Sequence, residues 1–397
     1  MNRTVASIDG AFQIMEILDT TLREGEQCFG VFFPIETKKR IARMLDALRV
    51  DFIEVGHPAA APSIRKAVSE LAGLDLRSHL IGHARLDRDE IRLVRDLGLQ
   101  WVGLFAGMNK ASLARYGLSR EAAWQRICDS VRYAKECGLQ VRFTCEDASR
   151  TAPDELAELY SRLREIGADR LSYADTVGTD TPERIEQLHQ AIHAIIPFSD
   201  LHFHFHNDLG NALANAEKAQ ELGAQCVDAS IMGIGERSGL LSIEDALVRL
   251  RSRGTAGPSA EERAVLEQAK DLVAASINMR HFARRRFAHK SGIHIHGVLR
   301  DPSQYEAEDP GRTGEQRTIV LSKLIGRAGL RRMLTWAGIE AADGVLEQLF
   351  AIVKSDEFLE LSDTREIIRY LKDHHQHMVN NAQASRTRSK HQQPAVR

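Results

Sequence analysis

The sequence predicts an α/β fold, a (β/α)8 TIM barrel followed by a mainly helical C-terminal region. Between residues 14 and about 253, short apolar runs alternate eight times with longer amphipathic stretches. Eight such strand–helix units in about 240 residues favour a closed barrel over an open doubly wound sheet. Periodicity alone does not establish closure, so the open sheet remains the alternative. After about residue 256 the alternation stops and helical patterns dominate.

The expected strands are short and rich in apolar residues. They are IMEILDTT (14–21), DFIEVGHP (51–58), SHLIGHA (78–84), WVGLFAG (101–107), QVRFTCED (140–147), RLSYADTVG (170–178), LHFHFHND (201–208) and CVDASIMGIG (226–235). Amphipathic helices are expected between them, most clearly over 37–50, 88–98, 153–168 and 182–196. Pro153 and Pro182 suit the first turn of a helix, and the glycines in EIGADRLSY and ELGAQCVDA suit helix ends.

These patterns divide the chain into four segments. Residues 1–13 form an N-terminal segment, 14–255 the catalytic barrel, and 256–375 a helical C-terminal subdomain that contributes to the active site. Residues 376–397 are polar and without period, so we expect a disordered tail.

Composition and charge narrow the function classes. Lysine plus arginine number 53 against 55 acidic residues, so the net charge of −2 gives no electrostatic reason to expect nucleic acid or a membrane surface as partner. No apolar run approaches the roughly 18 residues of a membrane span, and the N-terminus lacks the apolar core of a secretory signal. Five cysteines without a CxxC pair suit free thiols in a reducing compartment. We therefore expect a cytoplasmic protein that acts on small molecules.

Polar residues gather after almost every expected strand. DTTLREGEQ follows the first strand, CEDASR the fifth, ADTVG the sixth, HFHND the seventh and GIGERSG the eighth. In a TIM barrel all of these strand ends meet at one mouth, where the chemistry of such barrels lies. The sequence therefore predicts one composite site. GIGERSG lacks the spacing of a dinucleotide-binding loop, so a tight loop is at least as good an interpretation as phosphate binding.

The seventh expected strand carries His202, His204 and His206 at alternate positions. Residues two apart on a strand face the same side, so packing, metal binding and base catalysis are all open to them. His204 and His206 together with a carboxylate such as Glu24, Asp19 or Asp208 would hold Zn, Mn or Mg and leave positions for substrate.

Two further stretches suggest acid–base chemistry. Arg23 in the first strand end would supply a fixed positive charge for a carboxylate or a developing oxyanion. Glu146 and a histidine of HKSGIHIHG (His289, His294 or His296) would form the carboxylate–imidazole pair of a general base. The histidines of that C-terminal stretch reach the mouth only if their segment folds over a barrel, its own or a partner's.

Six motifs in a fixed order resemble one family, the acyl-CoA-dependent 2-oxoacid aldolases. They are DTTLREGEQ, FTCEDASR, ADTVG, HFHNDLGNALANA, GIGERSG and FAHKSGIHIHGVL, and the likeness runs from about residue 14 to about 330. The family comprises isopropylmalate and homocitrate synthases, which are barrel metalloenzymes of amino-acid biosynthesis. The resemblance implies that a divalent metal binds a 2-oxo acid, that acetyl-CoA loses a methyl proton and attacks the ketone, and that the thioester is then hydrolysed.

The resemblance also implies roles for individual residues. Glu24, His204 and His206 match the metal ligands, whereas His202 lies outside the motif and is expected to pack. Arg23 matches the residue that polarises the carbonyl and steadies the alkoxide. His294 matches the catalytic base, oriented by Glu146 and typically delivered from the other subunit of a homodimer. Gln27, Arg150 and Thr176 match substrate-contact positions, and Arg85 is a further expected substrate contact. Asn207 and Asp208 are expected to orient the metal ligands.

Within the family, the resemblance is closest to homocitrate synthases, which use 2-oxoglutarate. Leu240 stands where leucine-pathway enzymes carry Asn, and HPAAAP and FAHKSGIH also favour this group. Asp87 departs from the pattern, because a histidine for the distal carboxylate is expected there; His83 or Arg85 would have to replace it. The alternatives are an isopropylmalate synthase or a related alkylmalate or citramalate synthase, then a hydroxyacyl-CoA lyase, then a non-catalytic metal-binding barrel.

Overall fold

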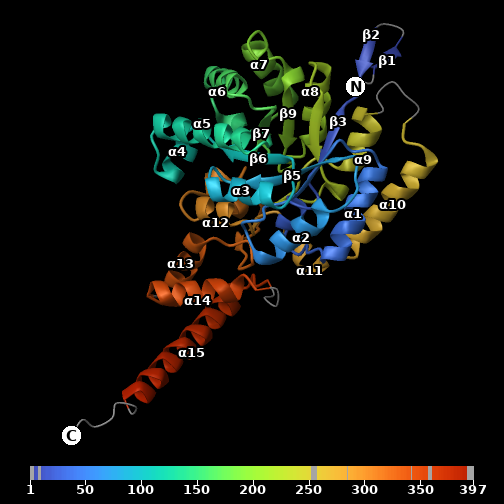
Figure 1. The fold of residues 1–397 in the computed structure, drawn as a ribbon. Coiled ribbons are helices and arrows are strands. Elements are labelled where there is room, and N and C mark those ends of the chain that lie inside the picture. Colours follow the sequence, from blue (N-terminus) through green and yellow to red (C-terminus); the bar gives the residue numbers. More distant parts are fainter. Residues whose placement is uncertain are drawn as a thin grey trace.

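The computed structural model describes residues 4–7, 10–251, 257–283, 285–340, 342–355 and 360–390. Its centre is a closed barrel of eight parallel strands (Figure 1). The strands are β3 (Glu16–Asp19), β4 (Phe52–Gly56), β5 (His79–Ala84), β6 (Trp101–Ala106), β7 (Gln140–Cys145), β8 (Arg170–Asp175), β9 (Leu201–Phe205) and β10 (Cys226–Ala229). Each lies within a predicted run, and pairing of β10 with β3 closes the sheet. The predicted barrel is confirmed, and the open sheet is excluded.

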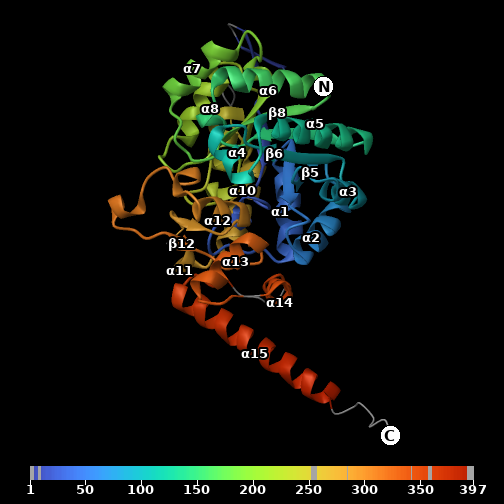
Figure 2. The same cartoon turned by 90° about the vertical axis from the view of Figure 1, so that its left-hand side faces the viewer.

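A ring of helices surrounds the strands (Figures 1 and 2). It consists of α1 (Ile35–Ala47), α2 (Pro62–Ala72), α3 (Arg88–Asp96), α4 (Lys110–Tyr116), α5 (Arg120–Glu136), α6 (Pro153–Glu165), α7 (Pro182–Ile192), α8 (Ala212–Glu221) and α9 (Ile243–Asp245), which continues as the π-helical η5 (Ala246–Arg251). Pro153 and Pro182 open their helices as predicted, because proline fixes a helical φ and needs no hydrogen-bond acceptor there.

The alternation of side chains along the strands creates two different interiors. Residues such as Ile17, Val55 and Phe143 point outward and pack under the helices. Burying one such side chain stabilises the fold by about 1.5–3 kcal/mol. The opposite face of the strands points into the barrel, where an apolar layer that includes Leu18 and Trp101 fills the end at which the strands begin. The charged residues described below lie above that layer, toward the strand ends.

The C-terminal region begins with α10 (Ala260–Ala274), which packs against α1. The elements that follow are α11 (Met279–Phe282), β11 (Ala288–His289), α12 (Gly292–Val298), β12 (Thr318–Ile319), α13 (Arg327–Trp336), α14 (Asp343–Val353) and α15 (Thr364–Lys390). Segments α12 to α14 lie below the barrel in Figure 1 and form a second small core around Ile295, Leu330 and Leu349. The predicted boundary at residue 255 falls within 252–256, outside the described residues.

Two segments differ from the sequence prediction. The N-terminal segment contains an antiparallel hairpin, β1 (Thr4–Ser7) and β2 (Gly10–Gln13), that the pattern did not indicate. Helix α15 runs through residue 390, well into the predicted disordered tail. Its first turns are anchored by buried Ile367 and Leu371, and extending an existing helix is far easier than starting one, so polar residues can continue it. Residues 391–397 of that tail lie outside the described residues.

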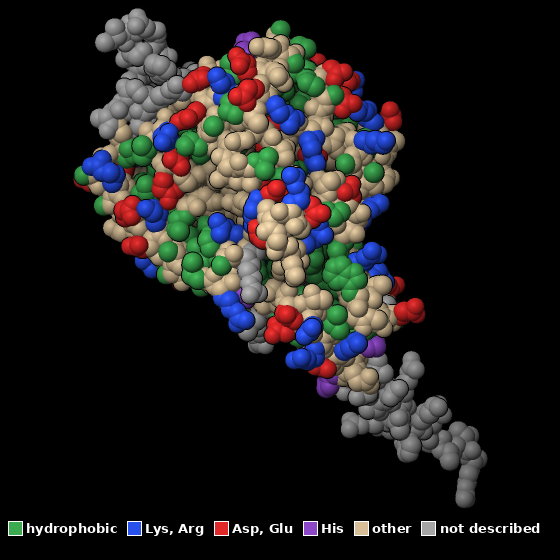
Figure 3. Space-filling view, turned by 180° about the vertical axis from the view of Figure 1, so that it is seen from behind, with side chains coloured by type: hydrophobic (Ala, Val, Ile, Leu, Met, Phe, Trp, Pro, Cys, Tyr) green, Lys and Arg blue, Asp and Glu red, His purple; other side chains and the backbone are tan. Residues whose placement is uncertain are grey.

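The surface mixes both signs of charge. In Figure 3, lysine and arginine side chains are interspersed with aspartate and glutamate over the barrel and the C-terminal region. Among the described residues, no helix combines the length and the apolar character that crossing a membrane requires.

Candidate active site

Three predicted metal ligands meet at the mouth of the barrel. Glu24 follows β3, His204 lies on β9, and His206 follows directly after β9. Their ligand atoms lie within 4.8 Å of one another, and all three side chains are buried. The Nε2 atoms of His204 and His206 are 3.3 Å apart, and His206 Nε2 lies 3.9 Å from Glu24 Oε1. The structure thus brings together the two imidazoles and one carboxylate that the sequence predicted.

Both imidazoles are oriented through their other ring nitrogen. His204 Nδ1 is 2.9 Å from Asp228 Oδ2, and His206 Nδ1 is 3.1 Å from the carbonyl oxygen of Gly239. Asn207 and Asp208, which we expected to do this, are engaged elsewhere. Asn207 accepts a hydrogen bond from the Ala212 amide at the start of α8, and Asp208 pairs with Arg237. The orienting partners are therefore Asp228 and a backbone carbonyl.

This arrangement fits a divalent cation. Hydrogen bonding at Nδ1 leaves both Nε2 atoms facing a common point, which is how metal-binding histidines are commonly held. Burial, reinforced by the nearby Arg237 cation, lowers the pKa of His206 well below its ordinary value, so the imidazole is in the neutral form that ligates metals. Two nitrogens and one carboxylate with room for oxygen ligands suit Mg, Mn or Zn.

Arg23 places a positive charge beside this centre. It forms ion pairs with Glu24 and, through Nη2 at 2.7 Å, with Glu54 on β4. His83 on β5 lies on the other side of Glu54, with 2.7 Å between its Nε2 and Glu54 Oε1. Burial alone would raise the pKa of Glu54, but its partners Arg23 and His83 hold this pKa well below its ordinary value. The predicted role of Arg23 as a fixed cation is compatible with this position.

A buried arginine completes the network and was missed from the sequence. Arg142 on β7 is 1% exposed and donates to Glu54 at 3.1 Å, Ser172 at 2.8 Å and Asp228 at 2.6 Å. Since Asp228 also holds His204 and Glu54 also pairs with Arg23, Arg142 connects the predicted metal ligand His204 to Arg23. A detectable signal was present: Glu54, Arg142 and Asp228 are each the single charged residue inside an otherwise apolar strand core, at an inward-facing position.

The C-terminal region supplies the predicted base, within the same chain. His294 on α12 has its Nδ1 3.6 Å from Glu236 Oε1, and its ring stacks on Tyr305 with centroids 4.0 Å apart. Burial, reinforced by Arg237, lowers the pKa of His294 well below its ordinary value and keeps the ring neutral. Because the single chain already brings His294 to its own barrel mouth, this geometry does not require delivery from a partner subunit.

Glu146, the expected partner of His294, contacts Tyr305 instead of the imidazole. Its carboxylate accepts a hydrogen bond from the Tyr305 hydroxyl at 2.5 Å and pairs with Arg115 of α4. Tyr305 therefore stands between Glu146 and His294, and Glu236 is the carboxylate that faces the imidazole. Burial, and after it the nearby Glu24 carboxylate, raises the pKa of Glu236 to about 8. Arg115 donates a hydrogen bond to the hydroxyl of Tyr305, which is 190 residues away, and no local sequence pattern predicts this contact.

The other two histidines of HKSGIHIHG have different surroundings. His289 is fully buried and pairs with Glu306 at 3.0 Å, and one of its ring nitrogens also lies within 4.8 Å of ligand atoms of Glu236 and His294. His296 is half-buried on α12. Of the three histidines that the sequence left open, the structure places His289 and His294 beside Glu236.

The residues assigned to the distal end of the 2-oxo acid are explained by local structure. Arg85 is largely exposed and is held by Glu90, which also binds His57. Asp87 is the N-cap of α3, and its side chain accepts hydrogen bonds from the backbone amides of residues 89 and 90. A carboxylate that caps a helix N-terminus is stabilised by the amide groups that donate to it and by the positive end of the helix dipole. The departure at Asp87 therefore has a structural reason.

The remaining predicted substrate contacts have different surroundings. Gln27 ends the short 3-10 helix η1 (Gly25–Gln27) and is half-buried. The Thr176 hydroxyl accepts a hydrogen bond from the Asp147 amide. Arg150 binds the Asp147 carboxylate and the carbonyl oxygens of residues 303 and 304, so it ties the barrel to the C-terminal region. Their contact with a substrate stays a prediction.

A cavity of about 230 Å³ opens beside His206. Leu240 lines it and is bridged to His206. Asn207, Met232, Phe282 and Arg285 also line it, so both the barrel loops and the C-terminal region contribute to its wall.

Comparisons with known proteins place this geometry in context. The HMGL-like family matches residues 14–274, and the homocitrate synthase post-HMGL domain-like family matches residues 282–358. Proteins named homocitrate synthase from Saccharolobus solfataricus and Sulfurisphaera tokodaii are 34% and 35% identical over 351 residues, which cover 86% of this chain and 76% of theirs.

Solved structures resemble the fold. A hydroxymethylglutaryl-CoA lyase from Pseudomonas aeruginosa has 22% identity and a TM-score of 0.60, with 69% of this chain and 96% of that chain covered. The HMG-CoA lyase from Brucella melitensis has 20% identity and a TM-score of 0.58, with 66% and 98% covered. At these identities the likeness concerns the barrel fold alone.

Proposed function

Because the chain belongs to the HMGL-like family, as its motifs predicted, we propose that it is a homocitrate synthase that condenses acetyl-CoA with 2-oxoglutarate. The expectation of an acyl-transferring enzyme is confirmed by the family and by the named relatives. The observation that carries the proposal is the grouping of Glu24, His204 and His206 with Arg23 at one mouth, beside His294.

Glu24, His204 and His206 would hold a divalent metal, Mg, Mn or Zn. When bound, such an ion would supply Lewis acidity and a template for the 2-oxo acid. The chain's own contribution is to keep both imidazoles neutral and turned toward one point, through Asp228 and the Gly239 carbonyl. This preorganisation is present in the folded chain before any ligand arrives.

His294 is the proposed base for the acetyl methyl group. A thioester α-proton is weakly acidic, so a neutral imidazole positioned near the methyl carbon is needed. The methyl proton moves to His294, and the electron pair that it leaves on the methyl carbon attacks the ketone carbon, so that a carbon–carbon bond forms. Arg23 stabilises the negative charge on the resulting alkoxide, which is then protonated. Water finally cleaves the thioester and releases free CoA.

The cavity beside His206 is where we propose that acetyl-CoA enters. Arg285 at its edge would attract the phosphates of the cofactor, and Leu240 would contact the acyl arm. Arg285→Ala should raise the KM for acetyl-CoA several-fold and leave the KM for the 2-oxo acid unchanged. Equal changes in both would place the acyl donor elsewhere.

A substrate panel tests the reaction. Purified protein with Mg²⁺ or Mn²⁺ is incubated with acetyl-CoA and, separately, 2-oxoglutarate, 2-oxoisovalerate, pyruvate, oxaloacetate and phenylpyruvate, and free thiol is followed. We expect the largest kcat/KM with 2-oxoglutarate. Release with 2-oxoisovalerate alone would favour an isopropylmalate synthase, and release with pyruvate alone a citramalate synthase. No release with any 2-oxo acid would overturn the synthase proposal.

We also propose a cytoplasmic homodimer. Sedimentation reports the dimer, and fractionation of cells that make the protein reports the compartment. Mixing inactive His206→Ala and His294→Ala chains tests how the site is completed. If each chain uses its own His294, as in the structure, no activity returns. Recovery of activity in the mixture would show that the histidine crosses between subunits.

A further inference from the structure

A second cluster of metal-binding side chains lies at the other end of the barrel, where the strands begin. Glu16 is the first residue of β3, Cys226 the first of β10, and His202 the second of β9. One ligand atom of each lies within 4.8 Å of those of the other two. We propose that these three residues form a second metal site, which binds a zinc-like divalent cation through a thiolate.

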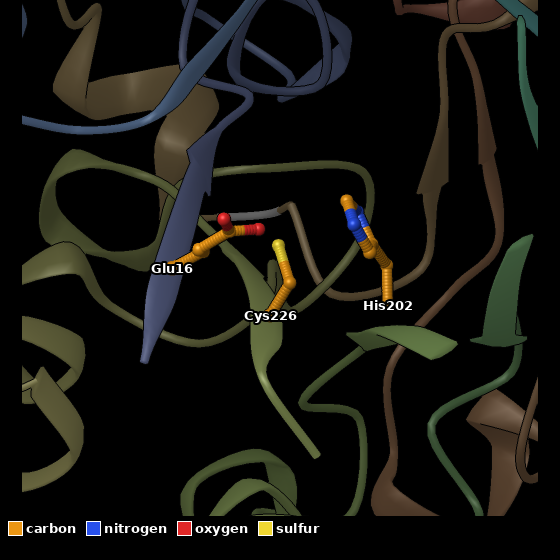
Figure 4. A group of neighbouring side chains, drawn as sticks. All are labelled: Glu16, His202 and Cys226. Atoms are coloured by element: carbon orange, nitrogen blue, oxygen red, sulfur yellow. The ribbon is translucent and has the colours of Figure 1, made fainter. Parts of the chain in front are cut away.

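The strand register places the three side chains at one level. Cys226 pairs with Glu16 on one neighbouring strand and with His202 on the other. Paired residues on adjacent parallel strands point to the same face, which here is the barrel interior. Figure 4 shows the Glu16 carboxylate and the Cys226 thiol turned toward one another, with His202 beside them.

The site is buried on one side and open on the other. Cys226 is 1% exposed and His202 3% exposed, whereas the Glu16 side chain is 38% exposed. Within the described part of the chain, His202 Nδ1 has no hydrogen-bond partner although it is buried. An unpaired buried nitrogen is costly, and coordination to a cation would relieve that cost. Glu16 gives the cation a route from solvent.

The donor set selects the class of ion. Thiolate, imidazole and carboxylate are ligands that zinc accepts together, and the thiolate disfavours Mg²⁺. Neighbouring ligand atoms of a tetrahedral zinc are about 3.5 Å apart, so binding would bring the three ligand atoms to that spacing. One thiolate and one carboxylate balance the two charges of the ion. Arg170, 3.5 Å from Glu16, competes for that carboxylate.

The position suggests a structural role. The cluster spans β9, β10 and β3, which includes the seam where the last strand of the barrel meets the first. A cation there would cross-link segments that are more than 180 residues apart in sequence. Because only the folded barrel assembles the three ligands, binding would stabilise the fold by mass action.

Cobalt(II) is the direct probe. Full-length protein saturated with Mg²⁺ is titrated with Co²⁺, and the ultraviolet thiolate-to-cobalt charge-transfer band is recorded. The catalytic candidates Glu24, His204 and His206 include no thiol, so cobalt at that centre gives no such band. We expect a band whose amplitude corresponds to one thiolate-bound cobalt ion per chain. Its absence in the wild-type protein would overturn the proposal.

Matched variants assign the band. Cys226→Ser and His202→Phe, the latter keeping an aromatic ring beside Phe52, should each abolish it. Cys145→Ser, which removes another buried thiol in a barrel strand, should retain it. Zn²⁺ should raise the melting temperature of the wild type and of Cys145→Ser by more than that of Cys226→Ser, in which only the Glu24, His204 and His206 centre remains to bind the ion. A band that survives in Cys226→Ser would contradict the site. None of these readouts depends on the proposed catalytic activity.

Discussion

The candidate active site has two halves that are held in different ways. In the barrel half, parallel strands present Glu54, Arg142 and Asp228, and each charged group has at least two partners of opposite charge or polar character. In the C-terminal half, His294 lies on the seven-residue helix α12, and its ring stacks on Tyr305. That half is joined to the barrel by side-chain hydrogen bonds between separate segments, such as those of Arg150 and Glu236.

This difference suggests a division of labour. Strands of a closed barrel give a rigid frame, which suits a metal that must be held in one geometry. A separate region that folds over the mouth can bring a base and exclude water. We therefore expect damage to the barrel half to remove metal binding, and damage to the C-terminal half to slow the reaction with the metal still bound.

The largest effect is expected from His206→Ala. Losing one of three protein ligands should lower Mn²⁺ affinity by more than about 100-fold, the upper end for losing only a partner of a ligand. Thiol release should fall to background. Isothermal titration with Mn²⁺ and the free-thiol assay measure the two effects, with His189→Ala on α7 as the control. Full activity in His206→Ala would remove it from the metal site.

Arg142→Met tests how rigid the barrel half is. The change leaves Glu54 and Asp228 buried without their shared cation, so the free energy of unfolding should fall by about 3–5 kcal/mol. Denaturant unfolding of the apo protein measures it, and Arg162→Met on the surface of α6 is the control. A loss below about 1 kcal/mol would mean that the network is not a structural unit.

Tyr305→Phe tests how the C-terminal half positions His294. The ring that stacks on His294 remains, but the hydroxyl that binds Glu146 is lost. We expect kcat to fall about tenfold, as for a modest change in the position of a base, with Mn²⁺ affinity unchanged. Tyr116→Phe, which alters the other hydroxyl beside Arg115, is the matched control. A fall in Mn²⁺ affinity would contradict the division between the halves.

The last prediction concerns stability in acid. Burial alone would raise the pKa of Glu90, but hydrogen bonds from His57 and Arg85 lower this pKa to about 2. Since the folded pKa lies below the unfolded value of 4.5, this stabilisation is complete above pH 4.5 and is lost as the pH falls toward 2. Glu90→Gln should therefore lose about 2 kcal/mol at pH 7 and less at pH 3. An equal loss at both pH values would contradict the pairing.

The sequence predicted the barrel half of the site better than the C-terminal half, for a physical reason. Strand periodicity and the rule that strand ends share one mouth brought His204 and His206 together with three candidate carboxylates, and the family resemblance selected Glu24 among them. The roles of Asn207 and Asp208 were misplaced, because adjacency in sequence does not give direction: after the strand the chain turns, and those side chains serve α8 and Arg237.

Contacts between distant segments had no local signature. His294 stacks on Tyr305 and lies opposite Glu236. Both contacts depend on how the C-terminal region packs against the barrel, which sequence periodicity does not describe. The length of α15 was missed for a related reason, since its anchor at Ile367 and Leu371 is a tertiary contact. The inward-facing Arg142, in contrast, was visible as a lone charge in an apolar strand.

One measurement tests the division between the two halves most directly: Mn²⁺ titration and thiol release on the same preparation of His294→Ala. Mn²⁺ should bind with wild-type affinity, while thiol release with the best 2-oxo acid should fall by about 10²–10⁴-fold, the usual contribution of a general base. His296→Ala, a change on the same short helix, should leave both unchanged. Loss of Mn²⁺ binding in His294→Ala, or turnover close to the wild type, would contradict the account.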